Sequence, residues 1–136
     1  MRIRLDTHAF PWFATGDQRL PAPALEIIQD PASNVFVSVA SCWEIAIKNS
    51  IGRLDLRISL DQLFNDEIED NGLVLLEIER LHVLEIPKLG AAHGDPFDHL
   101  LVAQAKFEKL VLLSSDRALD GYEIDRIWPP HNLKIQ

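Results

Sequence analysis

The sequence predicts an α/β fold: one domain with a central parallel β-sheet of about five strands and helices on both faces. Short apolar runs rich in β-branched residues alternate along the chain with stretches of helical periodicity. Strands that are joined through helices pair in parallel, because each connection crosses over the sheet. The chain has 136 residues with no linker or low-complexity tract, which suits one hydrophobic core. We therefore expect a single domain over residues 1–136.

Each expected strand is a compact apolar run. Residues 35–39 (Val-Phe-Val-Ser-Val) are a clear example, because β-branched side chains favour a buried strand. The expected strands cover residues 2–5, 35–39, 73–78, 110–114 and 123–128. Glycines 52 and 72 end two of the helices, since glycine readily adopts the left-handed conformation that closes a helix. The expected helices cover residues 8–14, 22–29, 41–50, 59–70, 80–86 and 96–108.

The composition is that of an ordinary globular protein, with 47% hydrophobic and 25% charged residues. Cys42 is the single cysteine, which excludes a disulfide framework or a cysteine-based zinc site and fits the reducing cytoplasm. The sequence has no signal-peptide pattern and no apolar run near the ~20 residues that a membrane helix needs. We expect a cytoplasmic protein that does not associate with a membrane.

The net charge of −8, from 13 basic and 21 acidic residues, argues against nucleic-acid binding through bulk electrostatics. Two possibilities stay open. One is an enzyme that takes nucleic acid into a cleft whose acidic charge is neutralised by metal. The other is a protein that binds a basic protein partner.

Four carboxylates stand where a parallel sheet gathers functional groups. Asp6 and Asp116 follow the first and fourth expected strands, and Glu44 comes shortly after the second. Asp98 lies in the first turn of the last long helix. Strand ends of one kind face the same edge of the sheet, so these residues converge on one crevice. Clustered acids raise one another's pKa values, and a divalent cation relieves the repulsion. The pattern predicts a carboxylate metal site.

Each acid also has a structural explanation as a helix cap. Asp6 and Asp116 would each cap the helical segment after its strand. The sequence Ser41-Cys42-Trp43-Glu44 fits a capping box, in which the glutamate side chain binds the serine N–H. Asp95 is the better cap of the last long helix, because Pro96 marks the first helical position.

Helical geometry favours a metal site for two of the acids. Leu101, Val102 and Ala105 follow Asp98 at the spacing of one helix face, so Asp98 shares an apolar stripe. Glu44 lies on a mostly apolar face as well. A buried acid is costly unless it is paired or bound to metal.

Side chains near the acids have two interpretations each. Thr7 and Ser115 would hold a carboxylate or a water in place, or would cap a helix. Lys48 follows the glutamate by four residues, so an ion pair is the default and a phosphate contact the alternative. His93 and His99 flank the expected site and would contact substrate or lie on the surface.

Four segments resemble the signatures of PIN-domain proteins, in particular of the VapC-type toxins. They are Asp6-Thr7-His8-Ala9, then Ser41-Cys42-Trp43-Glu44-Ile45-Ala46-Ile47-Lys48 with Gly52-Arg53-Leu54, then Asp95-Pro96-Phe97-Asp98-His99-Leu100-Leu101-Val102-Ala103-Gln104-Ala105, and Ser114-Ser115-Asp116. The resemblance spans nearly the whole chain in the expected order. One departure is His99, which stands where these toxins often carry arginine.

The resemblance implies a cytoplasmic, usually dimeric ribonuclease that acts as the toxin of a type II toxin–antitoxin system. It implies dependence on Mg²⁺, with Mn²⁺ able to substitute, and Asp6, Glu44, Asp98 and Asp116 as the catalytic and metal-binding acids. It also implies an antitoxin protein that docks on the toxin, blocks the site and represses their shared operon.

We expect Asp6 and Asp98 to bind Mg²⁺ directly, because this ion prefers oxygen and keeps several waters. Glu44 and Asp116 would orient water or complete the metal shell. The substrate would be single-stranded or loop RNA, since base pairing hides the base edges. Two alternatives stay open: a non-catalytic acidic α/β binding module and a Mg²⁺-dependent phosphotransfer domain. The second lacks the expected Asp-x-Asp, because the first strand is followed by Asp6-Thr7-His8.

Overall fold

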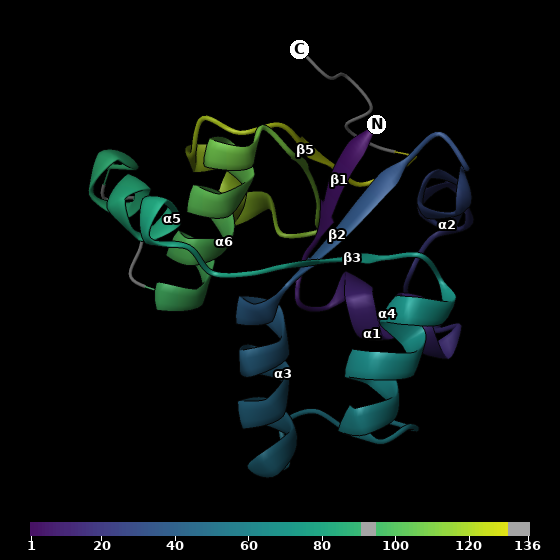
Figure 1. The fold of residues 1–136 in the computed structure, drawn as a ribbon. Coiled ribbons are helices and arrows are strands. Elements are labelled where there is room, and N and C mark those ends of the chain that lie inside the picture. Colours follow the sequence, from purple (N-terminus) through teal and green to yellow (C-terminus); the bar gives the residue numbers. More distant parts are fainter. Residues whose placement is uncertain (91–94, 131–136) are drawn as a thin grey trace.

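Five parallel strands form one sheet in the order β3-β2-β1-β4-β5 (Figure 1). The computed structural model describes residues 1–90 and 95–130. The strands are β1 (Arg2–Leu5), β2 (Asn34–Ser38), β3 (Val74–Leu76), β4 (Val111–Leu113) and β5 (Arg126–Ile127). The central strand β1 pairs with β2 on one side and β4 on the other. The predicted parallel α/β sheet is confirmed.

Helical segments make the connections between the strands. They are α1 (Ala9–Thr15), α2 (Ala22–Gln29), α3 (Val39–Ser50), a π-helical turn η1 (Gln62–Asp66), α4 (Glu67–Asp70), α5 (Arg80–Glu85), the 3₁₀ turn η2 (Ile86–Lys88), α6 (Pro96–Glu108) and the 3₁₀ turn η3 (Arg117–Gly121). Figure 1 shows α5 and α6 together on one side of the strands, with α1, α2 and α4 on the other. Within the described residues, no helix is both long and apolar enough to span a bilayer.

Alternation along the strands divides the core between the two faces of the sheet. Leu113 belongs to the larger buried cluster, which also includes Phe10 of α1. Its neighbour Leu112 belongs to a second cluster with Leu101 and Val102 of α6. Successive side chains of a strand point to opposite faces, so both faces need a helical cover. The predicted helices on both faces are confirmed.

Two expected details differ in the structure. The helix α3 begins at Val39, and its cap is Ser38, whose hydroxyl accepts a hydrogen bond from the Ala40 N–H at 3.0 Å. The predicted capping box of Ser41 and Glu44 is therefore wrong, because Ser41 already lies inside the helix. The expected outer strands are also longer than the observed β3 and β5, which pair along one edge only.

Candidate active site

A cavity of about 140 Å³ lies at the carboxyl ends of β1 and β4, and all four acids predicted from the sequence line it. Asp6 follows β1 directly and Asp116 comes shortly after β4, while Glu44 projects from α3 and Asp98 from the first turn of α6. Segments distant in the sequence meet here because parallel strands end at one edge of the sheet. The other lining residues are Thr7, His8, Lys48, Asp95, Leu101, Ser114 and Leu119.

Asp6 is the most deeply held of the acids, with 6% of its surface exposed. Its Oδ1 accepts a hydrogen bond at 2.6 Å from the N–H of Ala9, the first residue of α1, although the N-cap position of this helix is His8. The Ser114 hydroxyl donates to the same carboxylate. Burial raises the pKa of Asp6 and outweighs these hydrogen bonds, which act in the opposite direction. A cation at this position would favour the ionised carboxylate.

Both carboxylate oxygens of Glu44 have protein partners. The Thr7 hydroxyl donates to Oε1 at 2.7 Å, and Nζ of Lys48 lies 2.6 Å from Oε2. The Thr7 hydroxyl is also 3.3 Å from that of Ser41. Thr7 therefore does hold a carboxylate, and the expected ion pair between Glu44 and Lys48 is formed.

Two further acids of the cavity lining, Asp95 and Asp116, begin helical segments. Asp95 caps α6 as expected, since its Oδ1 accepts a hydrogen bond from the Phe97 N–H at 2.9 Å. Asp116 caps η3, with Oδ1 accepting from the Ala118 N–H at 3.0 Å. Capping and cavity lining are thus compatible, because a carboxylate has a second oxygen that can face the cavity.

Arg4 lies beside this site and was not expected there. Its guanidinium is fully buried, and it donates from Nη1 to the Leu5 carbonyl and from Nη2 to Oε1 of Gln104, both at 3.0 Å. Burial lowers the pKa of Arg4 to about 10, against the attraction of Asp6 and Glu44. It stays charged at neutral pH and offsets part of the acidic charge. The sequence did offer one indication of this role, because Arg4 is a charged residue within an expected buried strand.

Some residues expected near the site differ in position. Ser115 is exposed, and its neighbour Ser114 contacts Asp6 instead. Ser114 directly follows β4 and is buried, whereas Ser115 has turned toward solvent. His99 is half-buried and is not among the lining residues. His93 lies outside the described residues.

The family relationship agrees with this geometry. Residues 3–124 match the family model of the PIN domain. The chain belongs to the PIN domain family. PIN domains are generally nucleases, so membership supports a nuclease.

Three solved structures illustrate the similarity of this PIN domain to known folds. VapBC2 from Rickettsia felis bound to a DNA fragment from their promoter has a TM-score of 0.71 at 10% identity, over 93% of this chain and 98% of that chain. FitAcB from Neisseria gonorrhoeae has a TM-score of 0.64 at 16% identity, over 95% and 99%. VapBC-1 from nontypeable Haemophilus influenzae has a TM-score of 0.62 at 15% identity, over 93% and 97%. No curated protein sequence matches the chain significantly. The predicted PIN-domain family is confirmed, and the chain shares its fold with these solved structures.

The donor set of the PIN cavity fits a hard divalent cation, because carboxylate oxygens are the ligands that Mg²⁺ and Mn²⁺ prefer. The four acids do not form a tight cage. Among the residues that the structure describes, the group with three potential ligand atoms within 4.8 Å of one another is Glu79, His82 and Glu108. A loosely spaced carboxylate set suits Mg²⁺, which retains several of its waters.

The group of Glu79, His82 and Glu108 is explained by hydrogen bonding at the start of α5. Nδ1 of His82 accepts the Glu79 N–H at 3.0 Å, and the Glu79 side chain accepts the His82 N–H. The ring proton is thereby assigned to Nε2, which donates to Oε2 of Glu108 at 2.9 Å. A metal would need the lone pair of Nε2, so this arrangement favours a capping network.

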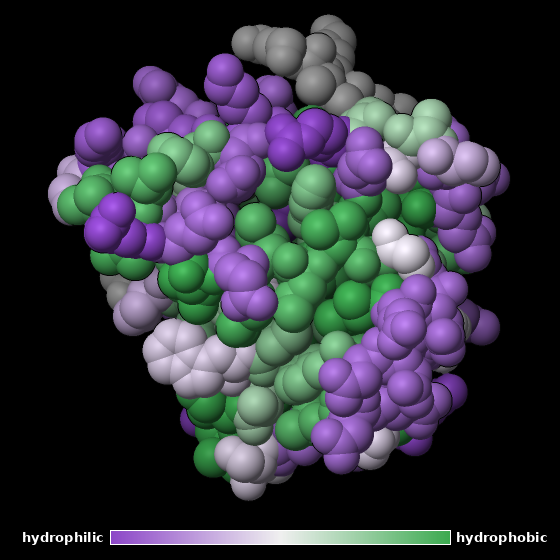
Figure 2. All heavy atoms as spheres, viewed as in Figure 1, coloured by the Kyte–Doolittle hydropathy of each residue, from purple (hydrophilic) through white to green (hydrophobic). Residues whose placement is uncertain are grey.

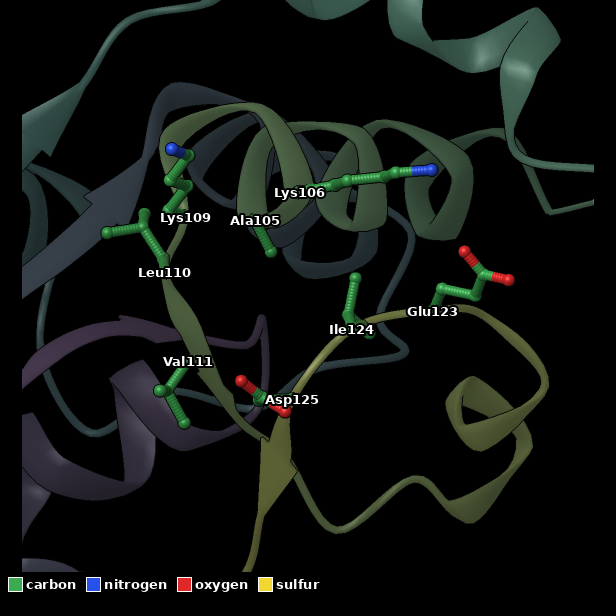
Figure 3. Close-up of a pocket in the computed structure, with 8 residues that line it drawn as sticks. All are labelled: Ala105, Lys106, Lys109, Leu110, Val111, Glu123, Ile124 and Asp125. Atoms are coloured by element: carbon green, nitrogen blue, oxygen red, sulfur yellow. The ribbon is translucent and has the colours of Figure 1, made fainter. Parts of the chain in front are cut away.

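A larger cavity, of about 730 Å³, lies at the opposite end of β4, where Lys106 of α6 and Lys109, which follows this helix, share the lining with the segment before β5 (Figure 3). Its lining contains Glu123 and Asp125 but none of the four predicted acids. The larger cavity therefore lies away from the carboxyl ends of the strands, where ligands of α/β folds bind.

Proposed function

We propose that this PIN domain is a metal-dependent endoribonuclease and the toxin of a toxin–antitoxin pair. One observation carries the proposal: Asp6, Glu44, Asp98 and Asp116, from four separate segments, line one cavity. We further propose that residues 1–136 act as one domain, in the cytoplasm.

The reaction would be hydrolysis of an RNA phosphodiester bond. Mg²⁺, or Mn²⁺ in its place, would be held by Asp6 and Asp98, and when bound it polarises a phosphoryl oxygen and lowers the pKa of a water. The Ala9 N–H fixes the Asp6 carboxylate, and Thr7 fixes Glu44. Asp116 is exposed at the cavity edge, where it would orient the attacking water and accept its proton.

Single-stranded or loop RNA is the substrate class that suits the site. A cavity of about 140 Å³ admits a phosphate group but not a duplex, and unpaired RNA presents a flexible backbone. With a net charge of −8, the protein would attract this RNA only where acidic charge is locally offset.

An exposed apolar surface supports a homodimer. Trp43 and Ile47 of α3 and its C-terminal cap Ile51 recur every four residues and are 56%, 38% and 60% exposed. Figure 2 shows apolar surface gathered on the face that carries α3, β3 and α5. Exposed apolar patches of this kind mark protein interfaces. We assign this face to a homodimer.

The antitoxin is proposed on separate grounds. Basic residues on the antitoxin would favour its binding, because the cavity is acidic and the PIN domain carries a charge of −8. The similar structure of VapBC2 is described as bound to a DNA fragment from their promoter, which is compatible with a shared role in operon repression.

Sequencing of RNA 5′ ends from cells that express the chain tests the proposed function. The wild type should produce new ends at defined positions, and Asp98→Asn should not. The matched control is Asp61→Asn, because Asp61 is exposed and lies outside the cavity lining. New ends at wild-type frequency with Asp98→Asn would overturn the site assignment.

Thermal unfolding with Mn²⁺ separates the nuclease from a binding module whose acids only cap helices. Asp95 and Asp116 do act as caps, and Asp6 accepts the first N–H of α1, so this alternative has direct support. A true site should gain about 2.7 kcal/mol of stability when Mn²⁺ is at about 100 times its Kd. An unchanged melting temperature at saturating Mn²⁺ would favour the binding module.

A further inference from the structure

Lys48 lines the acidic cavity, yet the proposed reaction assigns it no task. Its ammonium lies 2.6 Å from Oε2 of Glu44, one turn earlier on α3, and 33% of its side chain is exposed. Among the described lining residues it is the single lysine or arginine. Five carboxylates share that lining: Asp6, Glu44, Asp95, Asp98 and Asp116.

The two members of the Lys48–Glu44 ion pair differ in how firmly they are held. The Glu44 side chain is only 11% exposed, and the Thr7 hydroxyl fixes its second oxygen. The ammonium of Lys48 has three N–H donors on a flexible stem, and one contact with Glu44 leaves the others for a second acceptor. The fixed carboxylate therefore holds a movable cation at the wall of the cavity.

We propose that Lys48 binds a phosphate of the RNA chain as it enters the cavity, an inference that rests on the ribonuclease function above. A polyanion approaching five carboxylates needs a local positive charge, and a lysine ammonium binds phosphate as a point charge. The contact is non-covalent: the ammonium shifts from Oε2 of Glu44 to a phosphate oxygen. Glu44 is then released to face the cavity.

Removal of Lys48 should therefore change the affinities for RNA and for metal in opposite directions. Without Lys48 the RNA loses one phosphate contact, so RNA binding weakens. Without Lys48 the Oε2 of Glu44 also loses its competing cation, so a divalent metal binds more tightly. A lysine that merely supports α3 would change stability but neither binding equilibrium in this way.

The first measurement is binding of a labelled single-stranded RNA pool in Ca²⁺, at several salt concentrations, with gels that verify intact RNA. Lys48→Met should bind about fivefold more weakly at about 0.1 M salt, and its salt slope should be shallower by about 0.7, the value for one lost phosphate contact on a single strand. Lys48→Arg should restore the slope. The matched control is Lys106→Met, since Lys106 is exposed and outside this cavity.

The second measurement is calorimetric titration of the RNA-free protein with Mn²⁺. Lys48→Met should bind Mn²⁺ several-fold more tightly than the wild type, and Lys106→Met should match the wild type. If the wild type binds Mn²⁺ and cleaves RNA while Lys48→Met keeps the wild-type salt slope, the assignment of Lys48 is overturned and the nuclease stands. If the wild type neither binds Mn²⁺ nor cleaves RNA, the proposed nuclease function itself is overturned, and the inference about Lys48 with it.

Discussion

Arg4 and Gln104 meet in the interior between β1 and α6, with Nη2 of the arginine 3.0 Å from Oε1 of the glutamine. Both side chains are fully buried. The amide of Gln104 donates further to the Glu77 carbonyl at 3.3 Å. A buried guanidinium needs fixed acceptors, so this contact fastens α6 to the strand that leads into Asp6. Asp98 lies in the first turn of the same helix.

Replacement of Gln104 by leucine should destabilise the protein by about 2–3 kcal/mol, because the Arg4 guanidinium would lose a buried acceptor. Urea unfolding measures this loss. The matched control is Gln62→Leu, since Gln62 is exposed on η1 and should change stability little. Equal stabilities of the two variants would show that the contact contributes nothing to α6 docking.

Loss of the Thr7 hydroxyl should impair the site while the fold remains intact. Thr7→Val keeps the shape of the side chain but removes the hydrogen bond to Oε1 of Glu44. Removing a group that orients a metal-site carboxylate typically costs about 10–100-fold in metal affinity or activity. Thr7→Ser retains the hydroxyl and should stay near the wild type. Mn²⁺ titration and RNA cleavage test both variants, and a fully active Thr7→Val would contradict the proposed role.

Sequence reasoning succeeded where local patterns determine the outcome. The alternation of apolar runs and helical periods fixes a parallel sheet, and the capping signature of Asp95 and Pro96 fixes the start of α6. The carboxyl ends of parallel strands lie on one edge, so the shared cavity of Asp6 and Asp116 followed from topology alone.

Contacts between elements were beyond the reach of the sequence. Arg4 looks like an alternating strand residue, and only the packing of α6 reveals that its charge is buried against Gln104. The wrong cap for α3 has a similar origin, because Ser38 and Ser41 are both acceptable caps and the end of β2 decides between them. Local signals rank such choices but do not resolve them.

A charge in the apolar stripe of α3 should dissociate the proposed homodimer. Ile51 is 60% exposed and completes the stripe with Trp43 and Ile47. In a two-fold interface both subunits contribute the same stripe, so Ile51→Glu introduces two buried charges per dimer. Light scattering should give a dimer mass for the wild type and a monomer mass for the variant. The exposed Asn65 offers a control, as Asn65→Glu should remain dimeric. A monomeric wild type would contradict the proposed homodimer.

The ion pair of Asp120 and Arg126 should make stability depend on acid pH. Nε and Nη2 of Arg126 donate to the two Asp120 oxygens at 2.6 and 2.9 Å, and these bonds hold the pKa of Asp120 below its usual value. A lowered pKa in the folded state means that the unfolded chain takes up the proton first.

The stabilisation by Asp120 is therefore complete above the unfolded-state pKa of about 3.9 and is lost as the pH falls through the folded-state pKa. Asp120→Asn should melt below the wild type at neutral pH, and the difference should close in acid. The effect should be modest, because the Asp120 side chain is 55% exposed. Thermal melts from neutral to acid pH measure it, with Asp61→Asn as the exposed control. A difference that persists unchanged into acid would assign the effect to packing around Arg126, whose Nη1 also donates to the Ser114 carbonyl at 2.8 Å.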